Sequence, residues 1–224
     1  MSLFREKYRI LPPENGNGET VVLIHGLFVG SFILRKQGRF FQEHGYRSIL
    51  YDYPTTRREI GFHSEKLADF LNSAIFDSGS RIHFVTHSMG GLVLRGAVGK
   101  LTENRRSRLG RVVMIAPPNR GSDVASGVLN RVPGAQRLIV PLPDLSSGPA
   151  SFANAFPVPE NMPETGIIGA ERDHQVKPEY THLAGEADHI MLRGTHTGIL
   201  FRQVTAEQAY HFILFGRFKE ESDV

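Results

Sequence analysis

The chain has 224 residues, of which 40% are hydrophobic and 22% are charged, a composition typical of a globular protein rather than a disordered or fibrous one. Its formal net charge of +3 is too small to indicate a nucleic-acid-binding protein. The absence of cysteine excludes a disulfide framework, a thiolate nucleophile and a cysteine-based metal site. The length suits one α/β domain spanning residues 1–224.

Short apolar runs alternate with helix-like stretches, which predicts a mainly parallel sheet with helices on both faces. The expected strands are 7–11, 21–25, 48–53, 81–87, 112–116, 166–169 and 189–192. The expected helices are 32–44, 64–76, 89–101 and a last one that begins at residue 205. Ser64 is the expected N-cap of the second helix, and Thr205 with Gln208 forms a capping box at the last.

Residues 119–164 break this alternation, because they are rich in proline and glycine with only scattered apolar positions. A long irregular segment inside a compact domain is typical of a lid, a binding loop or disorder. We therefore expect a cap or lid insertion over the functional site. The densest basic run, 105–108 (RRSR), lies between an expected helix and strand and is interpreted as a solvated loop.

The first nine residues contain no apolar core of a signal peptide. No apolar run approaches the ~18 residues that a membrane span needs. The expected location is therefore cytoplasmic, with secretion after removal of a leader as the alternative.

A serine lies at the turn between the expected strand 81–87 and the helix that follows it, in the run 85–91 (VTHSMGG). Acyl transfer by serine needs a hydroxyl held clear of the sheet, and a sharp strand-to-helix turn provides this. Gly90 supplies the small residue two places after Ser88, whereas Thr86 stands two places before it, where glycine is usual. We interpret Ser88 as the nucleophile.

The loop 25–28 (HGLF) ends the strand 21–25 and is the expected oxyanion loop. Gly26 lets the backbone turn, so that the N–H of Leu27 pairs with the N–H of Met89 as two donors to a developing oxyanion. His25 is expected to brace this loop by hydrogen bonds rather than to transfer protons. Phe28 and Val29 are expected to line the substrate pocket together with apolar residues of 119–164.

Ten histidines compete for the role of general base. In a triad of the order serine, acid, histidine, the histidine follows the last strand, and His196 meets this condition. The others weighed lie within that strand, in the terminal helix or in the preceding loop, and are interpreted as packing or surface residues: His189, His211, His174 and His182. A metal site at the evenly spaced histidines 182, 189 and 196 is not expected, because they straddle a loop and a strand.

The acid of such a triad should follow the strand 166–169, and three carboxylates are candidates. Asp173 is preferred because it lies one turn beyond that strand. Glu171 is closer to the strand end and can point away. Asp188 opens the last strand, roughly 15–20 Å along the strand from the loop that holds His196.

Together these motifs resemble the lipase and esterase branch of the α/β-hydrolase family, and small bacterial lipases in particular. The resemblance rests on HGL at 25–27, the serine turn at 85–91, PNRGS at 118–122, DHQV at 173–176 and HTGIL at 196–200. It spans roughly residues 20–215 and implies an α/β-hydrolase fold and ester hydrolysis without a cofactor. The substrate that the resemblance implies is a small-molecule ester or lipid. Neither nucleic acid nor a metal is expected to take part.

Two other functions are compatible with the same residues. An acyltransferase or amidase would use the same triad, and chain-length and leaving-group profiles would separate these activities. A non-catalytic binding protein with this fold would usually lack one triad member, whereas all three positions are filled in this chain.

Overall fold

The computed structural model describes residues 7–76 and 79–220. The expectation about a leader rests partly on residues 1–6, which lie outside the described residues. None of the helices in the described ranges combines the length and apolarity that a membrane crossing needs.

A central sheet of seven strands organises the described part of the chain, in the order β1-β3-β2-β4-β5-β6-β7. β1 pairs antiparallel with β3, and every other pair is parallel. The strands are β1 (Lys7–Leu11), β2 (Thr20–Ile24), β3 (Arg47–Asp52), β4 (Ile82–His87), β5 (Leu109–Ile115), β6 (Thr165–Ala170) and β7 (Asp188–Leu192). The predicted mainly parallel sheet is therefore confirmed.

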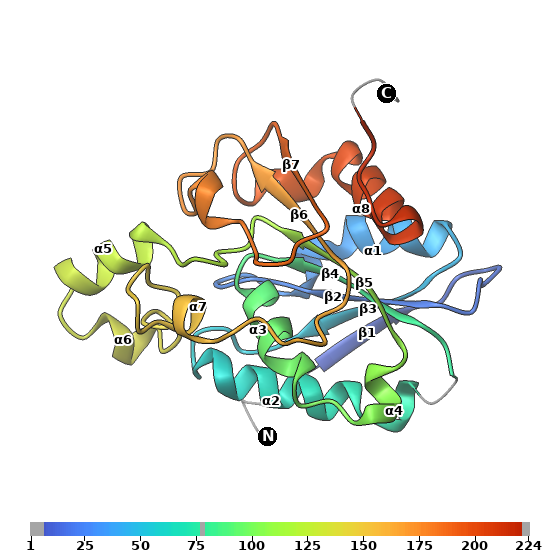
Figure 1. Ribbon diagram of the computed structural model, residues 1–224, viewed down its shortest axis with the longest axis horizontal. Coiled ribbons are helices and arrows are strands. Elements are labelled where there is room, and N and C mark those ends of the chain that lie inside the picture. The colour runs from blue at the N-terminus through green and yellow to red at the C-terminus, as the bar shows by residue number, and fades with distance from the viewer. Residues whose placement is uncertain (1–6, 77–78, 221–224) are drawn as a thin grey trace.

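Helices cover both faces of this sheet (Figure 1). The longer ones are α1 (Arg35–Glu43), α2 (Ile60–Leu71), α3 (Met89–Val98) and α8 (Gln203–Phe215). Short helices are α4 (Glu103–Arg106), α5 (Asp123–Arg131), α6 (Ala135–Leu138) and α7 (Phe152–Ala155), with 3-10 turns η1 (Ser31–Leu34), η2 (Ala74–Phe76), η3 (Pro178–Tyr180) and η4 (Gly198–Phe201). This arrangement is an α/β-hydrolase fold.

Two hydrophobic cores lie on opposite faces of the sheet because successive strand residues point in opposite directions. In β2, Val22 and Ile24 belong to the core that α2 and α3 cover. Val21 and Leu23 belong to the core that α1 and α8 cover. A strand buried on both faces is apolar at every position, which explains why β2 appears in the sequence as an unbroken apolar run.

Two predicted helix caps are wrong. α2 begins at Ile60, so Ser64 lies inside the helix, where its hydroxyl donates to the Ile60 carbonyl at 2.8 Å. α8 begins at Gln203, and the Thr205 hydroxyl donates to the Ile199 carbonyl at 2.8 Å. Serine and threonine hydroxyls can bond to a nearby backbone carbonyl as readily as they cap, and the sequence pattern does not distinguish the two. Gln208 instead bonds the backbone of Lys219.

The interpretation of 105–108 as a solvated loop is wrong for Arg105, which is only 2% exposed. Its guanidinium donates to the carbonyl of Phe76 at 2.6 Å and to that of Ser73 at 3.2 Å. The side chain is buried with its guanidinium hydrogen-bonded to main-chain carbonyls at and just before η2.

The segment 119–164 contains α5, α6 and α7, which lie together at one end of the molecule (Figure 1). α5 is capped by Ser122, whose hydroxyl accepts a hydrogen bond from the N–H of Ala125. Asp144 joins this segment to α2, because its carboxylate accepts the N–H of Ile60 at 2.8 Å. The segment is thus ordered helical structure attached to the main layers.

Candidate active site

Ser88 occupies a sharp turn between β4 and α3, with φ 51° and ψ −126°. A positive φ is unusual for a residue with a side chain, and such strain is common at functional sites. The turn depends on Gly90, because a Cβ there would lie 2.5 Å from the carbonyl oxygen of Ile24. Gly91 helps to make room for Thr86. A Cβ added at Gly91 would lie 3.3 Å from the Thr86 hydroxyl and would crowd it.

The structure brings Ser88, His196 and Asp173 into one hydrogen-bonded chain. His196 Nε2 lies 2.9 Å from Ser88 Oγ, and its Nδ1 lies 2.6 Å from Asp173 Oδ2. The three residues follow β4, β7 and β6, whose carboxyl ends meet at one edge of the parallel sheet. The side chains of His196 and Asp173 are 7% and 1% exposed, so solvent competes little for this contact.

The carboxylate of Asp173 is held in its ionised form by its hydrogen bonds. Burial acts to raise its pKa, but the bonds from His196 and from the backbone N–H groups of Val176 and Gln175 outweigh burial, so that the pKa is lowered. The two backbone donors are 2.9 and 2.8 Å from Oδ1. An ionised acceptor at this position fixes Nδ1 as the protonated nitrogen of His196 and leaves Nε2 free to accept the serine proton.

The other carboxylates weighed as acids lie elsewhere. Glu171 is exposed at the surface. Asp188 accepts the N–H of Phe218 at 2.7 Å, which attaches the segment after α8 to β7. Asp173 is thus the carboxylate of the three that contacts His196.

The remaining candidate histidines have surface or structural contacts. His182 pairs with Glu186 at 2.6 Å and stacks on His189. His189 bonds Thr181, His211 bonds the Arg217 carbonyl, and His174 is exposed. Within residues 7–76 and 79–220, no group of three or more histidine, aspartate and glutamate residues is arranged to hold a metal ion.

The loop after β2 packs directly against the serine turn. A Cβ at Gly26 would lie 2.8 Å from the Cβ of Ser88, so glycine is required for the two backbones to approach. Phe28 has a positive φ of 63°, and its N–H donates to the Thr55 hydroxyl at 3.2 Å. Met89 is the first residue of α3, and an N–H at that position has no partner within its helix.

His25 braces this loop, as its place in the sequence suggested. Its ring is fully buried, with Nε2 2.9 Å from Asp52 Oδ1 and Nδ1 3.0 Å from the Gly26 carbonyl. The hydroxyl of Tyr53 donates to the His25 carbonyl at 2.9 Å. The hydrogen bond with His25 lowers the pKa of Asp52, so the brace is anchored on an ionised carboxylate.

His87 is a residue of this site that the sequence analysis missed. Its Nε2 donates to the main-chain carbonyl of His196 at 3.0 Å, and its side chain is buried. The available signal was its position immediately before Ser88, but that position alone does not show which way the ring points.

A pocket of about 270 Å³ opens on Ser88 and His196. Phe28 and Val29 line it, and Leu27 does so as well. The segment 119–164 contributes one side of its wall with largely apolar side chains: Ser122, Val124, Ala125, Val128, Ile139, Leu142 and Leu145. An apolar pocket with a few polar groups at one end is typical of a small-molecule site.

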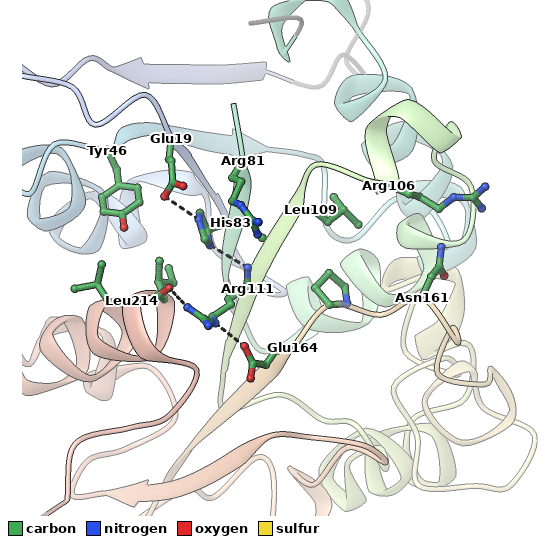
Figure 2. A pocket seen from close by; sticks show the side chains of 13 residues that line it. Glu19, Tyr46, Arg81, His83, Arg106, Leu109, Arg111, Asn161, Glu164 and Leu214 are labelled. Carbon is green, nitrogen blue, oxygen red and sulfur yellow. Dashed lines mark hydrogen bonds and ion pairs between the residues drawn. The ribbon is translucent and has the colours of Figure 1, made fainter. Parts of the chain in front are cut away.

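A larger cavity of about 620 Å³ lies at the opposite, amino ends of the strands (Figure 2). Its carboxylates are already paired: His83 contacts Glu19 at 3.2 Å and accepts the backbone N–H of Arg111, whose guanidinium bonds Glu164. These contacts connect the starts of neighbouring strands. We interpret this cavity as structural, because its carboxylates are already engaged.

Comparison with known proteins supplies a family and a fold. The model of a domain of unknown function, DUF7379, matches residues 5–130, and the chain belongs to that family. No curated protein matches it in sequence.

Solved structures with the same fold include lipases and an esterase. The mature form of the Bacillus licheniformis lipase BlEst2 superposes with a TM-score of 0.74 at 15% identity, covering 94% of this chain and 98% of the other. Aspergillus fumigatus lipase B gives 0.73 at 17% identity, covering 96% of this chain and 58% of the other. Est1E from Butyrivibrio proteoclasticus, with ferulic acid bound, gives 0.68 at 14%, covering 94% and 95%. At such identities the likeness shows the α/β-hydrolase fold.

Proposed function

We propose that this member of the DUF7379 family is a serine hydrolase that cleaves carboxylic esters through a covalent acyl-enzyme. The observation that carries the proposal is the contact chain from Ser88 through His196 to Asp173, at 2.9 and 2.6 Å. These are the distances at which a base can take the proton of a nucleophile while a third group orients the base. The lipases and esterases that share the fold give independent support.

In the first half-reaction, Ser88 Oγ attacks the ester carbonyl carbon while His196 Nε2 accepts the hydroxyl proton. Asp173 keeps the proton on Nδ1 and stabilises the imidazolium that forms. The carbonyl oxygen becomes an oxyanion, to which the N–H groups of Leu27 and Met89 donate. The tetrahedral intermediate then collapses: the bond to the alcohol oxygen breaks, and His196 gives its proton to that oxygen.

In the second half-reaction, water enters where the alcohol left. His196 takes a proton from the water, and the resulting hydroxide attacks the acyl carbon. Collapse of this second intermediate breaks the bond to Ser88, and His196 returns the proton to Oγ. The carboxylic acid leaves and the enzyme is restored, with no cofactor required at any step.

We assign the segment 119–164 as a cap that determines which ester enters. The segment contributes the apolar side chains of Val128, Leu142 and Leu145 to the pocket wall, and of its own lining residues only Ser122 is polar. Such a wall suits the hydrocarbon part of an ester, which gains free energy in proportion to the apolar area removed from water.

The experiment is a series of p-nitrophenyl esters with acyl chains of two to sixteen carbons, measured on the wild type and on Ser88→Ala. We expect hydrolysis by the wild type and a loss of at least about a thousandfold in kcat for Ser88→Ala. Ser126→Ala is the matched control: its hydroxyl lies in the cap and bonds Ser147, so its activity should be retained. Full turnover by Ser88→Ala would refute the proposal.

A further inference from the structure

A groove on the α1 and α8 side of the sheet combines exposed aromatic rings with exposed cations. It has a volume of about 510 Å³ and lies between η1, α1, η4 and the start of α8. We call it the basic groove and define it by Phe32, Arg35, Lys36, Arg39 and Phe201. It is separate from the catalytic pocket, whose lining includes none of these five residues.

The aromatic side chains of the basic groove are unusually exposed. Phe32 is 73% exposed and Phe201 is 53% exposed. Phe28, in the loop after β2, is also 67% exposed. All three residues lie in connections at the carboxyl end of the sheet, where Ser88 and His196 also lie. Exposed apolar groups gathered on one face indicate a surface that is covered by something when the protein works.

The cations follow the same helix face as Phe32. Residues 32, 35, 36 and 39 are all exposed and recur at helical spacing, so they form one stripe. Within residues 7–76 and 79–220, neither Arg35 nor Arg39 has a carboxylate partner. Glu43 is the carboxylate that the groove contains. The groove therefore carries a net positive charge and would attract an anion.

The two sides of the groove are held together by direct contacts. Lys36 Nζ donates to the Phe201 carbonyl at 2.6 Å, and Gln37 donates to that of Leu200 at 2.9 Å. These bonds join α1 to η4, so the cationic stripe and the second exposed phenylalanine keep a fixed relation. η4 begins at Gly198, two residues after His196, which places the groove beside the loop of the proposed base.

We propose that the basic groove docks the protein on an anionic phospholipid surface. Phenylalanine side chains enter the boundary between headgroups and acyl chains, while lysine and arginine remain at the depth of the phosphates. The cations of the groove match the negative potential of such a surface. A soluble polyanion would satisfy the cations but leave the rings in water, so the combination favours lipid. Docking here would turn the edge of the sheet that holds the catalytic pocket toward the membrane.

The proposal goes beyond ester hydrolysis and is tested without it. Ser88→Ala protein is mixed with vesicles of phosphatidylglycerol and phosphatidylcholine, or of phosphatidylcholine alone, and co-sedimentation is measured. We expect binding to the anionic vesicles that weakens with salt, and much weaker binding to the neutral ones. Equal binding to both vesicles, or binding to neither, would overturn the proposal, whatever the fate of the proposed function.

Two sets of variants locate the surface. The triple variant Arg35→Gln, Lys36→Gln, Arg39→Gln should lower the partition coefficient about a hundredfold. The matched triple Arg81→Gln, Lys100→Gln, Arg106→Gln removes the same charge near the amino ends of the strands. It should change the partition coefficient less than about threefold. If both triples lose binding equally, net charge and not the groove is responsible, and the proposal fails.

The aromatic contribution is tested in the same way. Phe32→Ser with Phe201→Ser should reduce vesicle binding at least about tenfold and should do so at high salt as well. Phe215→Ser is the control, since Phe215 is 60% exposed but lies at the far end of α8. The double variant is also tested for heparin binding. If it binds both vesicles and heparin as strongly as the wild type does, the groove is a polyanion site and the lipid proposal is wrong.

Discussion

The imidazole of His87 donates from Nε2 to the main-chain carbonyl of His196 at a distance of 3.0 Å. A carbonyl oxygen only accepts, so Nε2 must carry the proton. Burial, together with the repulsion that His196 would exert if both rings were protonated, lowers the pKa of His87 to about 3. The residue beside the proposed nucleophile is therefore a neutral donor that holds the backbone of the proposed base in place.

Buried neutral histidines predict a stability that falls in mild acid. Burial lowers the pKa of His63 to about 4, and that of His87 to about 3, from 6.5. Below about pH 6.5 the unfolded chain binds these protons and the native protein does not, so the free energy of unfolding falls as pH drops toward 4. Each group contributes at most about 1.4 kcal/mol per pH unit.

Urea unfolding at pH 7, 6 and 5 measures this slope, and His63→Phe should make it shallower. Asp52 and Asp173 do not contribute to this slope. Folding lowers the pKa of each carboxyl from 3.8, so the stability that each contributes is present above that value and is lost only as the pH falls below it. An unchanged slope in His63→Phe would show that His63 is not a neutral buried group.

Replacing Asp173 by asparagine tests the orientation of His196. The amide of Asp173→Asn would retain the shape but lose the charge that fixes the Nδ1 tautomer, so kcat for ester hydrolysis should fall by up to about 10⁴-fold, the loss seen for the corresponding change in a serine protease. Folding should be little affected, as judged by thermal unfolding. Glu171→Gln is the matched control and should keep nearly full activity. Comparable losses in the two variants would contradict the assignment of Asp173.

Asp52 tests the brace beneath the proposed oxyanion loop. Asp52→Asn weakens its contact with His25, now 2.9 Å, and through it the position of Gly26 and Leu27. Displacing the donor weakens the stabilisation of the transition state more than that of the bound substrate. We therefore expect kcat to fall about tenfold to a hundredfold with little change in KM. Asp69→Asn removes an exposed carboxylate and serves as control. A rise in KM at constant kcat would instead place the effect on substrate binding.

Arg95 connects the segment 119–164 to the helix that follows Ser88. It is 2% exposed and donates to the carbonyls of Phe152 at 3.0 Å, Ala153 at 2.8 Å and Asn119 at 3.4 Å. Arg95→Met would remove this donor from all three carbonyls, of which the Phe152 carbonyl keeps the N–H of Phe156 as a partner. The loss should cost about 2 kcal/mol and lower Tm by several degrees. Arg137→Met, on the exposed side of α6, should leave Tm within about a degree. Equal Tm values would show that the segment 119–164 does not depend on this anchor.

The fold was predictable because its signals are local. β2 is apolar at nearly every position, and the turn around Ser88 carries its own glycines, so the strands and their mainly parallel arrangement follow from the sequence. The boundaries of α2 and α8 were not predictable, since the hydroxyls of Ser64 and Thr205 can either cap a helix or bond back to a carbonyl. Tertiary contacts decide between these uses.

The candidate site was predictable where topology alone brings residues together. Ser88, Asp173 and His196 follow strands whose carboxyl ends share one edge, so their proximity follows from a parallel sheet. His87 and Arg105 were missed or misinterpreted because their roles depend on distant carbonyl groups, those of His196 and of Phe76. No sequence pattern reports which main-chain carbonyls a distant side chain will reach after folding.

The reactivity of Ser88 is the central claim, and covalent labelling tests it most directly. The folded protein is treated with a fluorophosphonate, and the adduct is located by mass spectrometry of peptides. We predict a single adduct on Ser88 that forms rapidly in the wild type, slowly in His196→Ala and not at all in Ser88→Ala. An unlabelled Ser88 in the folded wild type would contradict the account and leave a non-catalytic protein with this fold.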